Sequence, residues 1–291
     1  MSDDYFLDPR VVRRSFDRAA RTYDSAAAVQ REIRTRLLER LDIVRLAPTA
    51  VLDLGAGTGH ASRELKRRYS SAKVIALDLS LQMLRECARQ QSFLRRFAPV
   101  CADAHRLPLQ TGSVDLVLSN LLLEWCHDPD AVFAEVSRVL RPKGLFTFTT
   151  VGPDTLKELR ELWRGIDDTP HVHRFIDMHD FGDALLRAGF AEPVMDSERL
   201  TVTYPSLNAL LADLRGSGGR NIAAGRNHGL TGRARGGAVL ARSEALTRNG
   251  SLHISVEVIH GHAWAPAERR SRRTGAEVLV PIDTLRARRK G

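Results

Sequence analysis

The stretch VLDLGAGTG, residues 51–59, decides the fold that this sequence predicts. A short apolar run leads to an acid, Asp53, and then to three glycines, Gly55, Gly57 and Gly59. Glycine has no Cβ, so the backbone can turn sharply there and approach a ligand where a side chain would collide. The pattern therefore predicts a strand that delivers a ligand-binding turn, followed by a helix.

Apolar and amphipathic stretches alternate on either side of this turn. Short apolar runs predict strands at residues 50–54, 73–78, 99–102, 114–120 and 145–151. Helical spacing predicts helices between them at residues 60–69, 81–91 and 130–140. Such alternation is typical of an α/β fold in which helices cover both faces of a mostly parallel sheet. Ligands of these folds bind beyond the carboxyl ends of the strands.

The flanking segments extend this core. Helical spacing over residues 10–46 places five apolar residues on one face of a helix that ends before Pro48: Val29, Ile33, Leu37, Leu38 and Leu41. Further on, the sequence predicts helices at 154–163, 178–188 and 206–214, strands at 193–203 and 251–264, and a glycine- and arginine-rich loop at 216–237. We therefore expect a helical cap at 1–47, a main domain at 48–264 and a weakly ordered basic tail at 265–291. The main domain carries insertions at about 152–190 and 204–248 on its substrate side.

Composition limits the class of protein. With 291 residues, 43% hydrophobic and 27% charged, the chain can bury a sizeable core. The three cysteines form no C-x-x-C pair, which argues against a disulfide framework or a zinc ribbon. No apolar run reaches the roughly 20 residues that span a bilayer, and the N-terminus has no secretory signal. We expect a soluble, cytoplasmic protein with no membrane partner.

The glycine turn favours a particular cofactor. Its third glycine follows the second by two residues, whereas dinucleotide-binding turns place it three residues on. Asp53 is a poor neighbour for a pyrophosphate and a good one for an ammonium group. S-adenosyl-L-methionine (SAM) has an ammonium group and no phosphate, so the turn favours SAM.

Polar residues also end the later strands. Asp78 is placed to accept hydrogen bonds from two ribose hydroxyls, Asp103 to receive the adenine amino group, and Asn120 to face the transferable methyl group. Each residue alone is as often a helix cap or turn residue. Together they predict a SAM site.

These residues resemble the class I SAM-dependent methyltransferases over about residues 50–150. The likeness rests on VLDLGAGTG, the acid in ALDLS, the DA pair of CADAH, SVDLVLSN and RVLRPKG. It implies a Rossmann-like fold with a seven-stranded sheet that ends in an antiparallel hairpin. It also places Ala104 beside Asp103 in the cofactor site.

A narrower resemblance extends over about residues 12–264. It is carried by FDRAARTYD (16–24), SNLLLEWC (119–126), GPDTLKELR (152–160), HVHRFIDMHDFGDALLRAGF (171–190) and RNIAAGRNHGLTGR (220–233). These segments resemble the malonyl-acyl carrier protein O-methyltransferases of biotin biosynthesis. The likeness implies a SAM-dependent carboxyl O-methyltransferase that esterifies the free carboxylate of a malonyl thioester. Tyr23 resembles a family tyrosine that closes over the cofactor, and the alternative is an ordinary packed aromatic.

The acceptor side needs a cation rather than a base, because a carboxylate is already ionised near pH 7. No catalytic side chain is therefore expected. Arg174 in HVHRF is the predicted ligand of the malonyl carboxylate, and His171 is a second candidate. The family commonly has Asn where His173 stands. Trp125 either lines the acceptor channel or packs beneath it.

The net charge of +9 arises in residues 213–291. Five arginines there offer a docking face for an acidic acyl carrier protein: Arg215, Arg220, Arg226, Arg233 and Arg235. An arginine-favouring composition is the simpler alternative. The histidine pairs 171/173 and 260/262 have no further ligands at a recognisable spacing, so we expect no metal.

Two other functions stay open at this point. The first is methylation of RNA or another small molecule, although Asn120 does not begin an N-P-P-Y motif and no specific nucleic-acid partner is expected. The second is a SAM-fold assembly factor or hydroxylase-like protein similar to the mitochondrial complex I assembly factors. The sequence also leaves open whether the thioester is carried on protein or on coenzyme A.

Overall fold

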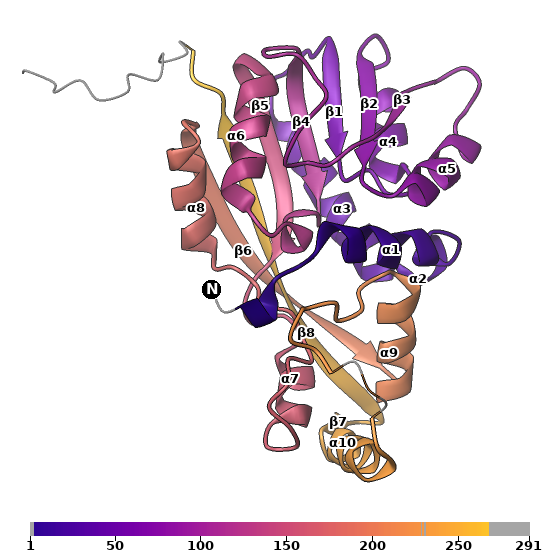
Figure 1. Ribbon diagram of the computed structural model, residues 1–291. Helices are drawn as coiled ribbons and strands as arrows, with labels where there is room; N and C mark the ends of the chain where they lie inside the picture. The colour runs from indigo at the N-terminus through magenta and orange to yellow at the C-terminus, as the bar shows by residue number, and fades with distance from the viewer. Residues whose placement is uncertain (1–2, 228, 230, 268–291) are drawn as a thin grey trace, which may run out of the picture.

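A single twisted sheet organises the molecule (Figure 1). The computed structural model describes residues 3–227, 229 and 231–267. The strand order is β3-β2-β1-β4-β5-β8-β6, and β1 to β5 pair in parallel. The bounds are β1 Ala50–Leu54, β2 Lys73–Asp78, β3 Ala98–Cys101, β4 Val114–Asn120, β5 Leu140–Val151, β6 Ala191–Tyr204 and β8 Ser251–Trp264. The class I Rossmann-like prediction of a seven-stranded sheet with an antiparallel end is confirmed, and a two-residue strand, β7 (Thr247–Arg248), is added beside β8.

Helices cover both faces of the sheet. On one face, α3 (Ala28–Glu39), α4 (His60–Arg68) and α5 (Leu81–Arg89) share an apolar core with β1 and β2. On the other face, α6 (Pro129–Val139) and α8 (Met178–Arg187) pack on an aromatic core around Phe133 and Phe146. The consecutive residues Val51 and Leu52 of β1 point to opposite faces of the sheet and belong to different cores, as the two-residue period of a strand requires.

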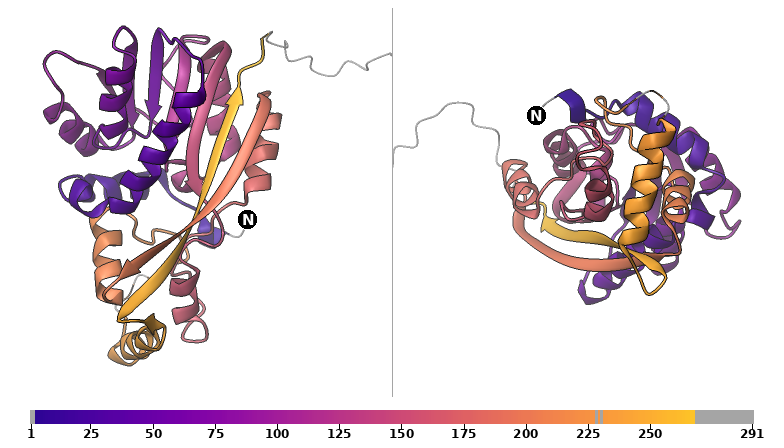
Figure 2. Two further views of the ribbon diagram at one scale, coloured as in Figure 1. Left: turned by 180° about the vertical axis from the view of Figure 1, so that it is seen from behind. Right: turned by 90° about the horizontal axis from the view of Figure 1, so that it is seen from below.

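The two antiparallel strands are 14 residues each and extend beyond the parallel ones (Figures 1 and 2). Around this extension lie α7 (Lys157–Trp163), α9 (Leu207–Gly216) and α10 (Arg233–Ala245). They form a smaller apolar core of their own, which includes Leu162, Leu210, Val239 and Ile254. Of the segments predicted as insertions, α7, α9 and α10 lie around this extension, whereas α8 packs on a face of the sheet.

The N-terminal segment crosses this edge. The 3-10 helix η1 (Asp3–Tyr5) precedes α1 (Pro9–Ala19), which lies beyond the ends of β1 and β2 (Figure 1). The helix predicted over 10–46 is divided, because α1 is followed by α2 (Tyr23–Ala26), α3 and the 3-10 helix η2 (Arg40–Ile43). The helical region ends before Pro48, as predicted. The predicted apolar face is buried, since Ile33 and Leu37 are 0% exposed.

The predicted glycine- and arginine-rich loop was wrong at its carboxyl end. The expected loop over 216–237 includes the start of α10, with Gly236 and Gly237 inside the helix. Glycine costs a helix about 1 kcal/mol, which packing of Val239 into the smaller core outweighs. Of the predicted tail, residues 268–291 lie outside the described residues. Among the described helices, none combines the length and the apolar character needed to cross a membrane.

Candidate functional site

The glycine turn is built by hydrogen bonds to the neighbouring strand. The N–H groups of Gly55 and Ala56 donate to the Leu77 carbonyl oxygen at 2.8 and 2.9 Å, and the Gly57 N–H donates to Asp78 Oδ2 at 2.8 Å. Both Gly55 (φ +81°) and Gly57 (φ +54°) adopt left-handed backbone, which favours glycine. A Cβ added at Gly57 would meet nothing within 4 Å, so open space lies directly in front of the turn.

A first cavity occupies this space, beyond the carboxyl ends of the parallel strands. Its lining includes eight of the predicted cofactor and channel residues: Tyr23, Gly55, Gly57, Asp78, Asp103, Ala104, Asn120 and Trp125. They come from five separate stretches of the chain, which the sheet brings together at one edge. Most of the remaining lining is apolar, with Val12 and Phe16 contributed by α1.

Asp53 and Gly59 were also expected at the cofactor, and neither lines the first cavity. The Asp53 carboxylate is 1% exposed and accepts a hydrogen bond from Ser62 Oγ of α4, so it faces away from the turn. Burial raises the pKa of Asp53 to about 7. Gly59 begins α4 at φ +81°, where a Cβ would overlap Cys87 Sγ, so its small size serves helix packing.

The acids that do line the cavity are held by local hydrogen bonds. Asp78 accepts from the N–H groups of Gly57 and Ser80, each at 2.8 Å, and burial raises its pKa to about 6. Asp103 accepts from the N–H of His105 at 2.9 Å and lies 2.6 Å from His105 Nδ1. Burial alone would raise the pKa of Asp103, but these hydrogen bonds from His105 outweigh it and lower the pKa. Both carboxylates keep acceptor capacity for a ligand.

Tyr23 and Asn120 close the cavity towards the N-terminal helices. Burial raises the pKa of the Tyr23 hydroxyl well above its usual value, so the phenol is neutral and can donate a hydrogen bond. Asn120 Nδ2 donates to the Gln30 carbonyl of α3 at 3.4 Å, and its Oδ1 accepts from Thr149 Oγ1 at 2.9 Å.

Arg34 of α3 was missed by the sequence analysis. Its guanidinium is half-buried, and burial lowers its pKa. Its charge acts on the pKa values of Tyr23, Asp53 and His60, and Arg34 is not among the residues that line the first cavity. Among the described residues it has no hydrogen-bond partner or acidic partner within ion-pair distance. A signal was present, because Arg34 interrupts a helix face between Ile33 and Leu37.

A second, wider cavity adjoins the first, and Cys126 lines both. Its wall includes Glu124, Arg160, His173 and Arg174. Trp125 stands at the boundary, with its ring edge-on to Phe16 at 5.1 Å and to His173 at 5.0 Å. Trp125 thus lines the first cavity and packs against both rings, and it is not among the residues that line the second cavity.

The two residues expected to bind the malonyl carboxylate, Arg174 and His171, have different surroundings in the structure. Arg174 lines the second cavity and is exposed. His171 lines neither cavity, because its ring stacks on Trp163 at 3.5 Å and its Nε2 lies 2.7 Å from Asp167 Oδ1. His171 is therefore part of the packing of α7 and not a ligand of the site.

Two further polar groups line the second cavity: the buried His173 and the half-buried Glu124, of which the sequence analysis did not mention Glu124. His173 is 6% exposed, its Nε2 accepts from the Ile222 N–H at 2.9 Å, and burial lowers its pKa to about 4, so the ring is neutral. Burial raises the pKa of Glu124 to about 7, and Thr150 Oγ1 donates to it at 3.2 Å. Both residues line the second cavity only, and His173 contacts Trp125, which lines the first.

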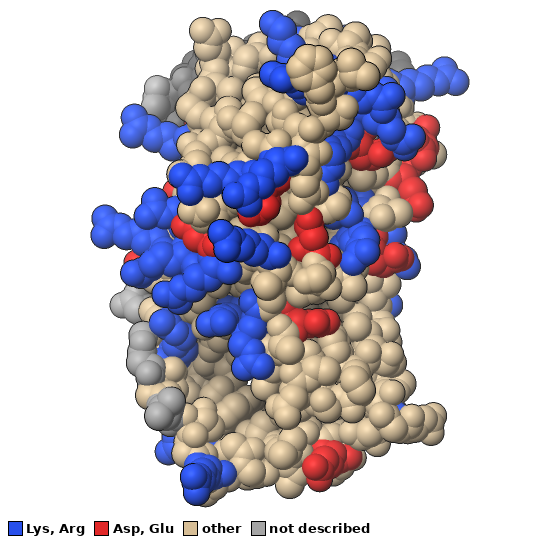
Figure 3. Space-filling view, turned by 90° about the vertical axis from the view of Figure 1, so that its right-hand side faces the viewer, with Lys and Arg blue, Asp and Glu red and all other residues tan. Residues whose placement is uncertain are grey.

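A shallow basin outside the cavities is lined by arginines. We define the basic basin by Arg14 and Arg18 of α1 with Arg215, Arg220 and Arg226. Within the part of the chain that the structure describes, none of the five pairs with a carboxylate. Figure 3 views this side of the molecule and shows Lys and Arg side chains gathered at mid-height on its left half.

The predicted docking face is thus divided. Arg233 and Arg235 lie on α10, outside the basic basin, and Arg235 is 3.8 Å from Asp167. The five arginines were predicted to act together because they are close in sequence. In the structure, Arg14 and Arg18 of α1 complete the basin in place of Arg233 and Arg235. Over residues 3–227, 229 and 231–267, no group of three or more His, Cys, Asp or Glu side chains is arranged to hold a metal ion.

Comparison with known proteins shows what this arrangement resembles. Residues 52–148 match the family model of a methyltransferase domain. Malonyl-[acyl-carrier protein] O-methyltransferases from Methylovorus sp. (strain MP688) and Laribacter hongkongensis (strain HLHK9) are 51% and 50% identical to the chain. These matches cover 92% of this chain and 93% of the first relative, and 94% and 95% for the second.

Solved structures share the fold at low sequence identity. The YcgJ protein of Bacillus subtilis is 16% identical, with a TM-score of 0.58 over 79% of this chain and 97% of that one. Phosphoethanolamine N-methyltransferase 2 of Haemonchus contortus, solved with SAM, is also 16% identical, with a TM-score of 0.54 over 86% of this chain and 57% of that one. At this identity the likeness concerns the fold alone.

Proposed function

The chain belongs to the family of malonyl-[acyl-carrier protein] O-methyltransferases, and from this premise we propose that it methylates the free carboxylate of a malonyl group carried on acyl carrier protein. It is a SAM-dependent methyltransferase with the class I Rossmann-like fold. The proposed product, a malonyl methyl ester, enters an early step of biotin biosynthesis.

The first cavity fits SAM at several points. The open space in front of Gly57 suits a ligand that contacts backbone N–H groups, and Asp78 ends β2 where ribose hydroxyls would lie. Asp103 and Ala104 would hold the adenine, Tyr23 would close over the cofactor, and Arg34 would attract its carboxylate. When bound, SAM supplies an electrophilic methyl group on a sulfonium centre.

Asp53 and Gly59 act indirectly in this proposal. The Asp53 carboxylate accepts a hydrogen bond from Ser62 of α4, and it does not line the first cavity. Gly59 lets α4 approach α5 closely. Both would position the turn that binds SAM without touching the ligand.

One observation carries the choice of acceptor. The second cavity adjoins the cofactor cavity and contains two arginines, Arg160 and Arg174, for which the described residues provide no carboxylate partner. An unpaired cation in a partly buried wall favours an anionic ligand. A malonyl carboxylate supplies that charge, whereas a neutral acyl group does not.

The chain's own residues would act by orientation and exclusion of water. The acceptor carboxylate is ionised near neutral pH, so no side chain has to remove a proton before methyl transfer. Trp125, Phe16 and His173 form an aromatic wall between the cavities that would align the acceptor and keep water out. No residue is therefore assigned as a catalytic acid or base.

The basic basin is proposed as the docking face for the acidic carrier protein. Opposite charge speeds association and sets orientation, and the effect weakens as salt screens it. Ile222 lines the basin, and its N–H bonds His173 in the wall of the second cavity, so the basin lies next to the acceptor route.

A methyl-transfer assay tests the function. The purified chain is incubated with labelled SAM and either malonyl-acyl carrier protein or malonyl-coenzyme A, and the ester is identified by mass. We expect label in a malonyl methyl ester with the carrier protein. Absence of ester from both acceptors would reject the proposal. Transfer of the label to RNA or to another small molecule, offered as acceptors in parallel, would indicate a different transferase.

The docking face has its own test. Arg215→Glu with Arg220→Glu should raise the KM for malonyl-acyl carrier protein but not for malonyl-N-acetylcysteamine, which has neither protein nor phosphate. Arg233→Glu on α10, outside the basin, is the matched control. Equal effects of the basin and control variants would move the docking face elsewhere.

A further inference from the structure

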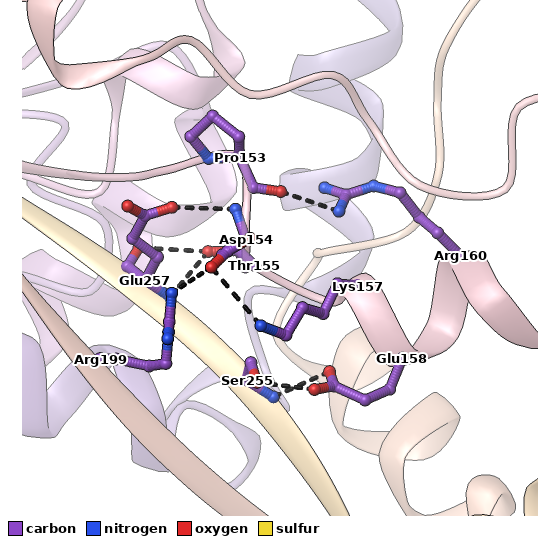
Figure 4. Close-up of polar contacts among 9 residues, drawn as sticks. All are labelled: Pro153, Asp154, Thr155, Lys157, Glu158, Arg160, Arg199, Ser255 and Glu257. Carbon is purple, nitrogen blue, oxygen red and sulfur yellow. Dashed lines mark hydrogen bonds and ion pairs between the residues drawn. The ribbon is translucent and has the colours of Figure 1, made fainter.

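The turn that joins β5 to α7 is fastened to β8 at Glu257 (Figure 4). The Gly152 N–H and the Thr155 hydroxyl donate to the Glu257 carbonyl oxygen at 2.9 and 3.1 Å, and the Asp154 N–H donates to Glu257 Oε2 at 2.9 Å. The Glu257 N–H in turn donates to Thr155 Oγ1 at 3.0 Å. A Cβ at Gly152 would overlap the Glu257 carboxylate, so the approach is as close as the backbone permits. The start of α7 is therefore held in one position.

Every carboxylate in this cluster is committed to another group. Asp154 pairs with Arg199 and with Lys157, the latter at 3.5 Å, and Glu158 accepts from Ser255 N–H and Oγ at 2.9 and 2.6 Å. Glu257 is bound to the turn. Figure 4 shows Arg160 on the same helix with a dashed line to Pro153 alone. Within the described residues, Arg160 has no carboxylate partner.

Arg160 is nevertheless partly buried. Its Nη1 donates to the Pro153 carbonyl oxygen at 2.8 Å, and its guanidinium carbon lies 5.6 Å from the centre of the Phe175 ring. Burial lowers the pKa of Arg160, but a guanidinium stays charged at any physiological pH. Because Pro153 belongs to the fastened turn, the contact fixes the cation at the wall of the second cavity and leaves further N–H donors uncommitted.

The other two arginines of this cavity have different surroundings. Arg187 forms paired hydrogen bonds with both carboxylate oxygens of Asp130, each at 3.0 Å, so its charge is neutralised. Arg174 is exposed, and an exposed cation gains little from an ion pair because water screens it. Arg160 alone combines partial burial, a fixed position and an uncompensated charge.

The acids that line the same cavity do not pair with Arg160 in the part of the chain that the structure describes. Asp130 is taken by Arg187, and Asp177 accepts from the His179 N–H at 2.8 Å. Asp180 lies in the first turn of α8 and lines the same cavity. Glu124 is a half-buried carboxyl of the wall, and its raised pKa keeps a large share of it neutral near pH 7.

We propose that Arg160, rather than the more exposed Arg174, binds the acceptor carboxylate and sets the preference for malonyl over neutral acyl thioesters. This inference rests on the proposed function and assigns a specificity-determining residue within it. Binding through a guanidinium leaves an oxygen lone pair free to accept the methyl group. Esterification then removes the negative charge that Arg160 binds, so the product is held less tightly than the substrate.

The test compares two acceptors that differ in one carboxylate, malonyl- and acetyl-acyl carrier protein. Binding of each is measured to the full-length chain saturated with S-adenosylhomocysteine, the demethylated cofactor. We expect Arg160→Gln to weaken malonyl binding by about 10- to 100-fold, the range for loss of charged hydrogen bonds, and to leave acetyl binding and cofactor affinity unchanged. Arg160→Lys should give a smaller loss, because lysine keeps the charge without the forked geometry.

The matched control is Arg164→Gln, since Arg164 lies just past the end of α7 with a 79% exposed side chain paired to Glu161. It should preserve the malonyl preference. The proposal is overturned if Arg174→Gln abolishes the preference while the Arg160 variants retain it. Should Arg160→Gln not fold, Arg160→Lys carries the same comparison. A wild-type chain that methylates no malonyl thioester would instead reject the proposed function, independently of these binding ratios.

Discussion

The backbone N–H of Gly57 donates a hydrogen bond of 2.8 Å to Oδ2 of Asp78, which joins the glycine turn after β1 to the acid that ends β2. The two strands pair in register up to Leu54 and Leu77, so the bond continues the sheet past its last residue pair. One group thus supports the shape of the turn and offers its remaining lone pairs to a ligand. Substitution of Asp78 should therefore affect both the shape of the turn and the affinity for the ligand.

Asp78→Ala should reduce affinity for S-adenosylhomocysteine by at least about 10-fold, because a charged hydrogen-bond acceptor is lost. Asp78→Asn keeps an acceptor for Gly57 and should lose less. With a pKa of about 6, Asp78 is ionised above pH 6, so wild-type affinity should fall as the pH drops below that value. Titration calorimetry between pH 5 and pH 8 measures both effects, and unchanged affinity in the alanine variant would remove Asp78 from the site.

Two glycines of the turn, Gly57 and Gly59, should not respond alike to alanine. Gly57→Ala places a methyl group in open cavity space, so the main loss should be in cofactor binding, with about 1–2 kcal/mol of backbone strain. Gly59→Ala adds a collision with Cys87 to the same strain and should lower the free energy of unfolding more. Adding Cys87→Ala to Gly59→Ala should recover part of that loss. Denaturant unfolding and cofactor binding separate the two effects, and identical behaviour of the single variants would contradict the assignment.

Arg34 should act on the amino-acid end of the cofactor. Its unpaired, half-buried charge predicts that Arg34→Ala weakens S-adenosylhomocysteine but not 5′-methylthioadenosine, which lacks the carboxylate. The expected loss for the first ligand is about 10-fold or more. Arg31→Ala, an exposed neighbour on α3, serves as the control. Parallel losses for both ligands would mean that Arg34 supports the fold instead.

Glu124 should make acceptor binding depend on pH. Its pKa of about 7 means that it is mostly protonated below pH 7 and ionised above, where its charge would repel the acceptor carboxylate. We expect the KM for malonyl-acyl carrier protein to rise between pH 6.5 and pH 8.5. Glu124→Gln, which stays neutral, should flatten this rise while the KM for SAM is unaffected. A rise of the same size in the glutamine variant would assign the pH dependence to another group.

His173 should contribute to stability through a single acceptor atom. Its Nε2 accepts the Ile222 N–H, so His173→Ala leaves a buried donor unsatisfied and should lower the free energy of unfolding by about 1–3 kcal/mol. His173→Asn can supply a carbonyl oxygen in place of the ring nitrogen and should be milder. Thermal unfolding tests the order of the three proteins. An asparagine variant as unstable as the alanine variant would show that ring packing on Trp125, and not the hydrogen bond, is what matters.

Local patterns in the sequence were sufficient for the central sheet. The strands β1, β2, β4 and β8 have the bounds that apolar runs predict, because each run is short and ends at a polar or turn residue. The start of α7 was displaced from 154 to 157, since residues 152–156 are bound to β8 about 100 positions further along the chain. β5 begins at Leu140 and not at 145, because Leu140 pairs with Val114 of β4. Local spacing carries no information about a partner so far along the chain.

The amino-acid sequence by itself determined the fold class, the cofactor and the family, because these depend on residue types at short, regular spacings such as the turn from Gly55 to Gly59. Only the tertiary structure decided which side chains face a ligand. It turned Asp53 towards Ser62, stacked His171 on Trp163, and set Arg160 unpaired in a cavity wall. Whether a charged group is available to a ligand depends on which distant groups surround and neutralise it, and folding alone brings those groups together.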